Sequence, residues 1–74
     1  MTTILDAKGL KCPLPILRTK KALTDMQSGQ VLKVVATDPG AVKDFAHFCE
    51  TTGHALVESR QEGDVYSFLI RKAA

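Results

Sequence analysis

A cysteine placed between a lysine and a proline is the residue in this chain best suited to covalent chemistry. The stretch GLKCPLP, residues 9–15, puts Cys12 directly before Pro13, and Pro15 follows two residues later. Cysteine reacts as its thiolate, which a neighbouring cation and the N-terminus of a helix both stabilise. Because Lys11 precedes it and a proline begins the predicted helix, we expect the pKa of Cys12 to be lowered. Cys12 is therefore the candidate catalytic nucleophile.

The residues around Cys12 predict how its sulfur is held. Pro13 and Pro15 fix backbone angles and Gly9 permits a turn, so the sulfur is expected at a defined, exposed position. The helix could begin at Pro13 or at Pro15, because Pro15 disfavours the helical conformation at Leu14. Both prolines also lack an N–H group, which weakens the case for a phosphate-binding loop.

The remaining Cys and His residues do not extend this candidate site. Position 15 is proline, so a persulfide on Cys12 would have no adjacent thiol to expel its outer sulfur. Cys49 falls on an apolar helix stripe, where we expect it in the core and not in a disulfide with Cys12. Positions 47 and 49 lie about 200° apart on a helix, so His47, Cys49 and His54 predict no metal site. Nothing places either histidine beside Cys12, as a cysteine hydrolase requires.

Apolar periodicity and turn residues predict six elements in the order β-α-β-α-β-β. The first helix carries a stripe at i, i+3, i+7 and i+10, and Gly29 follows its end. The second begins with Asp38 as N-cap and Pro39 in its first position, and ends at Gly53. The hairpin turn is EGD. The predicted strands are residues 3–6, 30–37, 55–61 and 65–72. The first predicted helix is residues 13–27, and its apolar stripe consists of Ile16, Thr19, Leu23 and Met26. The apolar stripe of the second helix consists of Val42, Phe45, Ala46 and Cys49.

This element order predicts an α/β two-layer sandwich. Right-handed crossovers put both helices on one face of a mixed four-stranded sheet. Tyr66, Phe68 and Ile70 share one face of the last strand. The other sheet face stays open, with Val31, Val35 and Leu69 expected there.

Length and composition predict one cytoplasmic domain, residues 1–74. The chain is 45% apolar, which supplies a core without a disulfide framework. We find neither a signal peptide nor an apolar run of about 18 residues, the length that spans a membrane. Charge is uneven: residues 1–21 carry net +4 and the remainder net −2. We therefore take Lys11, Arg18 and Lys21 as candidate residues for docking an acidic partner.

Three stretches resemble the TusA-like sulfur-carrier family: LDAKGLKCPLP, VVATDPGAVKDFAHFCETTGH and FLIRK. The resemblance covers residues 5–72 and includes the Cys-Pro-x-Pro motif at Cys12, Pro13 and Pro15. It implies the two-layer sandwich predicted above and a sulfurtransferase that acts as a persulfide carrier. Cys12 would accept sulfur from a cysteine desulfurase or a rhodanese-like donor and pass it to an acceptor protein. The best-known branch of the family leads to 2-thiouridine in tRNA; others serve sulfur oxidation, molybdenum-cofactor and selenium metabolism, and the motif does not distinguish them.

The resemblance also sets expectations about ligands and partners. The carried group is the persulfide on Cys12, and we expect no metal or organic cofactor, no direct nucleic-acid or membrane binding, and a monomer. Two alternatives stay open: a thiol-bearing regulatory or interaction module, and a small RNA-binding α/β module. The aromatic residues follow core spacing and no Gly-x-x-Gly clamp is present, which weighs against RNA binding. Mutation of Cys12 separates the carrier from the RNA binder.

Overall fold

A computed structural model describes residues 2–73 and has the predicted order of elements. Two strands each precede a helix, and a hairpin follows the second helix. The six elements are β1 (Thr2–Ala7), α1 (Leu14–Thr24), β2 (Val31–Ala36), α2 (Ala41–Thr52), β3 (Ala55–Glu62) and β4 (Val65–Arg71).

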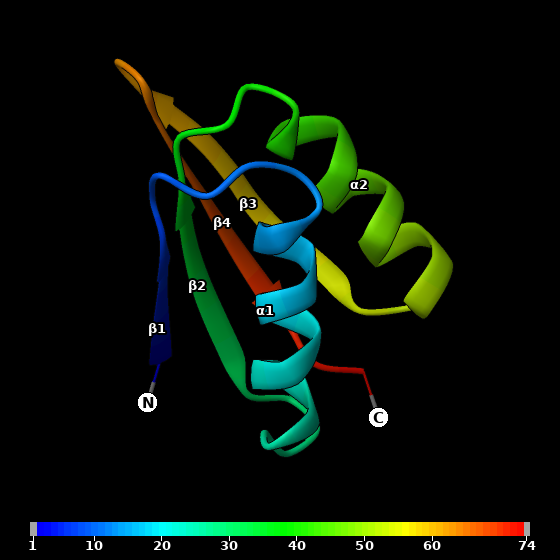
Figure 1. Ribbon diagram of the computed structural model, residues 1–74. Coiled ribbons are helices and arrows are strands. Elements are labelled where there is room, and N and C mark those ends of the chain that lie inside the picture. Colours follow the sequence, from blue (N-terminus) through cyan, green and yellow to red (C-terminus); the bar gives the residue numbers. More distant parts are fainter. Residues whose placement is uncertain (1, 74) are drawn as a thin grey trace.

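The four strands form one mixed sheet in the order β1-β2-β4-β3. β1 and β2 pair in parallel, whereas β4 pairs antiparallel with both β2 and β3. Figure 1 shows α1 and α2 together on one face of this sheet, with both helices starting at the same end of the molecule. The predicted two-layer α/β sandwich is thus confirmed.

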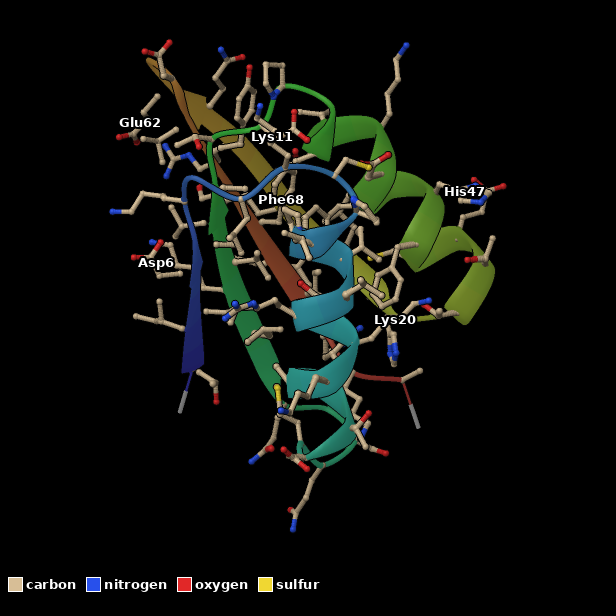
Figure 2. All side chains as sticks on the ribbon, in the orientation of Figure 1. Asp6, Lys11, Lys20, His47, Glu62 and Phe68 are labelled. Carbon is tan, nitrogen blue, oxygen red and sulfur yellow. The ribbon has the colours of Figure 1, made fainter. Side chains whose placement is uncertain are left out.

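The core lies between the sheet and the two helices. Along β2 the burial alternates, so that Leu32, Val34 and Ala36 face the helices. Phe68 of β4 stacks on Phe45 of α2 with ring centroids 4.6 Å apart, and Figure 2 shows Phe68 between the two layers. Such a pair adds about 0.5–1.5 kcal/mol to the free energy of unfolding beyond its burial.

The first helix follows its predicted stripe closely. Thr19 and Leu23 are buried, and Met26 is buried just beyond the last turn, whereas Ile16 is only half-buried. The Thr19 hydroxyl donates a hydrogen bond to the carbonyl oxygen of Pro15, at 2.8 Å, which satisfies this buried polar group. The helix ends at Thr24, three residues before the predicted end. Gly29, with φ 86°, lies in the turn that follows.

The second helix corrects two predictions. It begins at Ala41 with Gly40 as N-cap residue, so Asp38 does not cap it by side-chain hydrogen bond and Pro39 lies outside. The buried positions are Ala41, Phe45, Phe48 and Cys49, while the predicted core residues Val42 and Ala46 are exposed. The predicted and the observed sets of buried residues both fit a helical period, but the sheet packs against the observed set. Gly53 ends the helix at φ 83°, as predicted.

The face of the sheet away from the helices is uncovered. Val31, Val35 and Leu69 are half-buried there, as expected, and charged side chains surround them. Figure 2 shows Asp6 and Glu62 on this side. Among residues 2–73, neither helix is long and apolar enough to cross a membrane.

Candidate functional site

Cys12 lies on the loop between β1 and α1, with an exposed side chain. Pro13 is the N-cap residue of α1, so Cys12 sits just outside the helix, which resolves the open boundary. Because β1 and β2 run parallel and each is followed by a helix, the loop after β2 lies at the same end of the sheet. The site is therefore built where two loops meet.

Two hydrogen bonds tie these loops together. The backbone N–H of Gly9 donates to the Thr37 hydroxyl at 3.0 Å. The backbone N–H of Cys12 donates to Oδ2 of Asp38 at 2.9 Å. The other oxygen of Asp38 accepts the N–H of Gly40 at 3.2 Å. Asp38, predicted as a helix cap, instead joins the cysteine loop to the start of α2.

The predicted positioning residues lie where they can hold this loop. Gly9 has φ 81°, a left-handed conformation that favours glycine. Leu10 packs against the core, and Pro15 is buried on α1. Pro13, by contrast, is exposed, and its carbonyl accepts the Leu17 N–H in the first turn of the helix. The cysteine loop is thus anchored on both sides while the sulfur faces solvent.

Two carboxylates lie close to the sulfur, and they overturn the prediction of a lowered pKa. The sulfur and one carboxylate oxygen each of Asp38 and Asp44 lie within 4.8 Å of one another. The Asp44 carboxylate favours the protonated thiol as a hydrogen-bond acceptor, and desolvation and the two negative charges act in the same direction, so the pKa of Cys12 is raised above its ordinary value. The helix dipole acts weakly here because Cys12 is outside α1 and the prolines remove N–H donors. The absence of a metal cofactor stays a prediction.

Two shallow depressions adjoin Cys12 on either side. One, of about 390 Å³, lies between the two loops and is lined by Lys11 and Asp38. The other, of about 330 Å³, lies between α1 and α2 and is lined by Lys20 and His47. Figure 2 shows Lys11 at the loop end of the molecule and Lys20 between the helices.

The predicted docking residues are only partly brought together. Lys11, Arg18 and Lys21 are all exposed, but the residues lining the two depressions include Lys11 alone of the three. Lys20, which sequence analysis did not select, faces the groove beside Cys12. Its spacing from Pro13 and Ile16 on one helix face, i, i+3 and i+7, was the pattern that could have identified it.

The second cysteine does not take part in the site. Cys49 is buried, and both cysteines are free thiols, as predicted. His54 accepts the Ala73 N–H through Nδ1 at 2.9 Å, and its ring lies 5.8 Å from that of Phe48. His47 is exposed and lines the groove with Cys12. The three residues therefore lie in different surroundings, and that they hold no metal stays a prediction.

Known proteins resemble this chain over nearly its whole length. A family model described as "Sulfurtransferase TusA" matches residues 3–72. A sulfur carrier protein TusA of Allochromatium vinosum is 62% identical over 69 residues, which are 93% of this chain and 91% of that protein. One of Pseudomonas paraeruginosa is 45% identical over 71 residues, or 96% of this chain and 90% of that one. The crystal structure of a SirA-like protein from Desulfitobacterium hafniense superimposes with a TM-score of 0.84 at 26% identity, covering 100% of both chains.

Proposed function

The chain belongs to the TusA sulfurtransferase family, and we propose that it carries sulfur as a persulfide on Cys12. The observation that carries this proposal is the exposure of one thiol on a loop whose backbone N–H groups are fixed by Thr37 and Asp38. A carrier needs a sulfur that two different proteins can reach in turn. The family membership supports a role in sulfur transfer, and the geometry supports Cys12 as the carrying residue.

The loading step moves one sulfur atom without a separate oxidant. The Cys12 thiolate attacks the outer sulfur of a donor persulfide, and a new S–S bond forms at Cys12. The donor's own S–S bond breaks, and the donor cysteine departs as a thiolate with the electron pair. Cys12 is then a persulfide, Cys–S–SH, which is the carried group.

The unloading step is the same exchange in the opposite direction. A thiolate of the acceptor attacks the outer sulfur, and Cys12 leaves as a thiolate with the electrons of the broken S–S bond. Pro13 and Pro15 stiffen the loop, and Gly9 permits its turn. No second thiol lies within the motif to expel the outer sulfur and close a disulfide, and Cys49 is buried in the core.

The finer assignments form part of the same proposal. The donor is a cysteine desulfurase or a rhodanese-like protein, and the acceptor is the next protein of a relay. The destination is 2-thiouridine in tRNA or another sulfur-trafficking route, in a cytoplasm that keeps both thiols reduced. Three of the four aromatic side chains, Phe45, Phe48 and Phe68, are buried, which supports a protein partner over stacked RNA bases.

Mass spectrometry of the loaded carrier tests the proposal. After incubation with a cysteine desulfurase and cysteine, we expect one added sulfur atom at Cys12 and none at Cys49. The Cys12→Ser variant, which keeps Cys49, is the matched control and should gain no sulfur. Equal labelling of both cysteines, or loading of the Cys12→Ser variant, would exclude Cys12 as the carrying residue.

A further inference from the structure

The Asp44 carboxylate lies beside the Cys12 thiol and the carboxylate of Asp38. It lies in the first turn of α2, half-buried, with a carboxylate oxygen within 4.8 Å of the Cys12 sulfur. Within residues 2–73 no backbone or side-chain N–H group donates a hydrogen bond to this carboxylate, and no lysine, arginine or histidine nitrogen lies within ion-pair distance. A partly buried carboxylate normally has a donor, and the Cys12 thiol is the donor this geometry supplies.

Asp38, the second carboxylate near the sulfur, is engaged differently. Its two oxygens accept the backbone N–H groups of Cys12 and Gly40. These bonds fix the loop and use both oxygens of Asp38 as acceptors of backbone hydrogen bonds. The two aspartates therefore contact different parts of Cys12: Asp38 binds its backbone N–H, and Asp44 lies beside its thiol.

The positions of the two groups decide which one keeps the proton between them. Asp44 lies at the N-terminal turn of α2, where the helix dipole stabilises a negative charge. Cys12 lies outside α1, and an adjacent carboxylate opposes formation of its thiolate. The remaining charged or titratable groups that line the depressions at Cys12 are Lys11, Lys20 and His47. The Cys12 thiol therefore stays protonated beside this carboxylate.

We propose that Asp44 is an autoinhibitory residue, which keeps Cys12 as the unreactive thiol until a partner protein docks. This inference rests on the proposed function, because it describes how the same cysteine is switched on. A docked partner that presents a positive group to Asp44, or displaces its carboxylate, removes the charge that opposes the thiolate. The thiol proton then passes to water, and the Cys12 thiolate attacks the donor's outer sulfur as described above.

The contact has a consequence for selectivity. Small thiol reagents and low-molecular-weight persulfides carry no docking surface, so they meet Cys12 in its thiol form and react slowly. A protein donor both releases the thiol and delivers the sulfur. Asp44 thus favours exchange within the relay over loss of sulfur to small molecules.

The test compares Asp44→Asn with Glu50→Gln, an exposed residue of the same helix that loses the same charge away from Cys12. Alkylation of Cys12 by iodoacetamide is followed by peptide mass spectrometry between pH 6 and pH 10. Each unit by which the pKa falls raises the thiolate fraction at neutral pH about tenfold. For Asp44→Asn we expect a profile shifted to lower pH and a rate at pH 7 raised by about three- to tenfold. Glu50→Gln should follow the wild type.

A second measurement separates this inference from the proposed function. Loading from a low-molecular-weight persulfide should accelerate in Asp44→Asn, while loading from a protein donor gains less, so that the preference for the protein donor falls. If Asp44→Asn alkylates with the wild-type pH profile, the inference is overturned whatever happens in loading. If its alkylation accelerates but neither variant nor wild type takes up sulfur, the Asp44 contact stands and the carrier function fails. Asp44→Ser provides a second variant should Asp44→Asn fold poorly.

Discussion

Cys12 and Asp38 are joined by a hydrogen bond from a backbone N–H to a carboxylate, 2.9 Å long, across 26 residues of sequence. The bond leaves the sulfur free, because it uses the main chain of Cys12. The same carboxylate accepts the N–H of Gly40 at the start of α2. Asp38 follows the central strand β2 in the sequence. Its side chain therefore fixes the cysteine loop relative to both β2 and the second helix.

Replacing Asp38 by alanine should loosen this loop. The N–H groups of Cys12 and Gly40 lose their acceptor, at a cost of about 1 kcal/mol in the free energy of unfolding. Since small misplacements of a reacting group reduce rates severely, sulfur transfer from a protein donor should fall about tenfold or more. Asp38→Asn, which keeps one acceptor oxygen, should lie between.

Thermal denaturation and stopped-flow transfer measure the two effects. Asp64→Ala, at an exposed residue of the hairpin turn between β3 and β4, is the control and should retain both stability and rate. Full-rate transfer by folded Asp38→Ala would contradict a positioning role.

Gly9→Ala and Gly29→Ala form a matched pair. Both glycines have positive φ, 81° and 86°, and a Cβ at either would meet no atom within 4 Å. The cost is therefore backbone strain, about 1 kcal/mol in each, or a melting temperature lower by about 4–8 °C. Because only Gly9 lies in the cysteine loop, we expect slower sulfur transfer in Gly9→Ala alone. Equal transfer rates in the two variants would show that the turn at Gly9 does not position Cys12.

Charge reversal can map the docking surface around Cys12. If an acidic partner docks over the groove, Lys20→Glu should slow association more than Lys21→Glu, since Lys20 lines the groove and Lys21 does not. Reversing Arg18 together with Lys21 tests the basic surface predicted from the sequence. Raised salt should slow the wild type and reduce the differences, because exposed charges are screened over about 8 Å at physiological ionic strength.

Stopped-flow transfer at two salt concentrations measures these rates, and alkylation of Cys12 in the same variants controls for its reactivity. An equal loss in Lys20→Glu and Lys21→Glu would point to general steering by net charge. Wild-type rates in all variants would mean that this surface does not meet the partner.

The buried thiol of Cys49 gives stability a specific pH dependence. Burial raises its pKa above the ordinary value of 9.0, so the unfolded chain ionises at lower pH than the folded one. The stabilising contribution is complete below that ordinary value and is lost as pH rises through the raised, folded value. Chemical denaturation between pH 7 and pH 10.5 should show a steeper alkaline loss in wild type than in Cys49→Ala. Parallel curves would mean that Cys49 does not titrate differently on folding.

Local sequence patterns were sufficient to predict the six elements and their order. Gly53 and the EGD turn lie where a left-handed residue or a hairpin is required, and strand β2 alternates as its β-branched residues suggest. The burial phase of α2 was wrong because Val42 and Ala46 fit the helical period as well as Ala41 and Phe48 do. Only the position of the sheet decides between the two stripes.

Local sequence patterns could not predict which residues surround the Cys12 sulfur. Cys12 and its prolines are recognisable as a local motif, but Asp38 and Asp44 reach it only after the parallel pairing of β1 with β2 has brought two loops to one end. Asp38 before Pro39 also matches a helix cap, an equally good local explanation. The direction of the Cys12 pKa depends on these long-range neighbours, so it could not follow from Lys11 and the helix end alone.

The hydrogen bond to Asp38 gives Cys12, an exposed residue, an unusual hydrogen-exchange behaviour. In an ordinary surface loop the amide hydrogens exchange with solvent quickly, through local fluctuations that cost almost no free energy. The amide of Cys12 is instead bonded to a side chain at the end of β2, a strand paired on both sides. We expect the amide hydrogen of Cys12 to exchange slowly although its sulfur is exposed to solvent. Faster exchange of this hydrogen would then report opening of the loop without any chemical modification of the thiol.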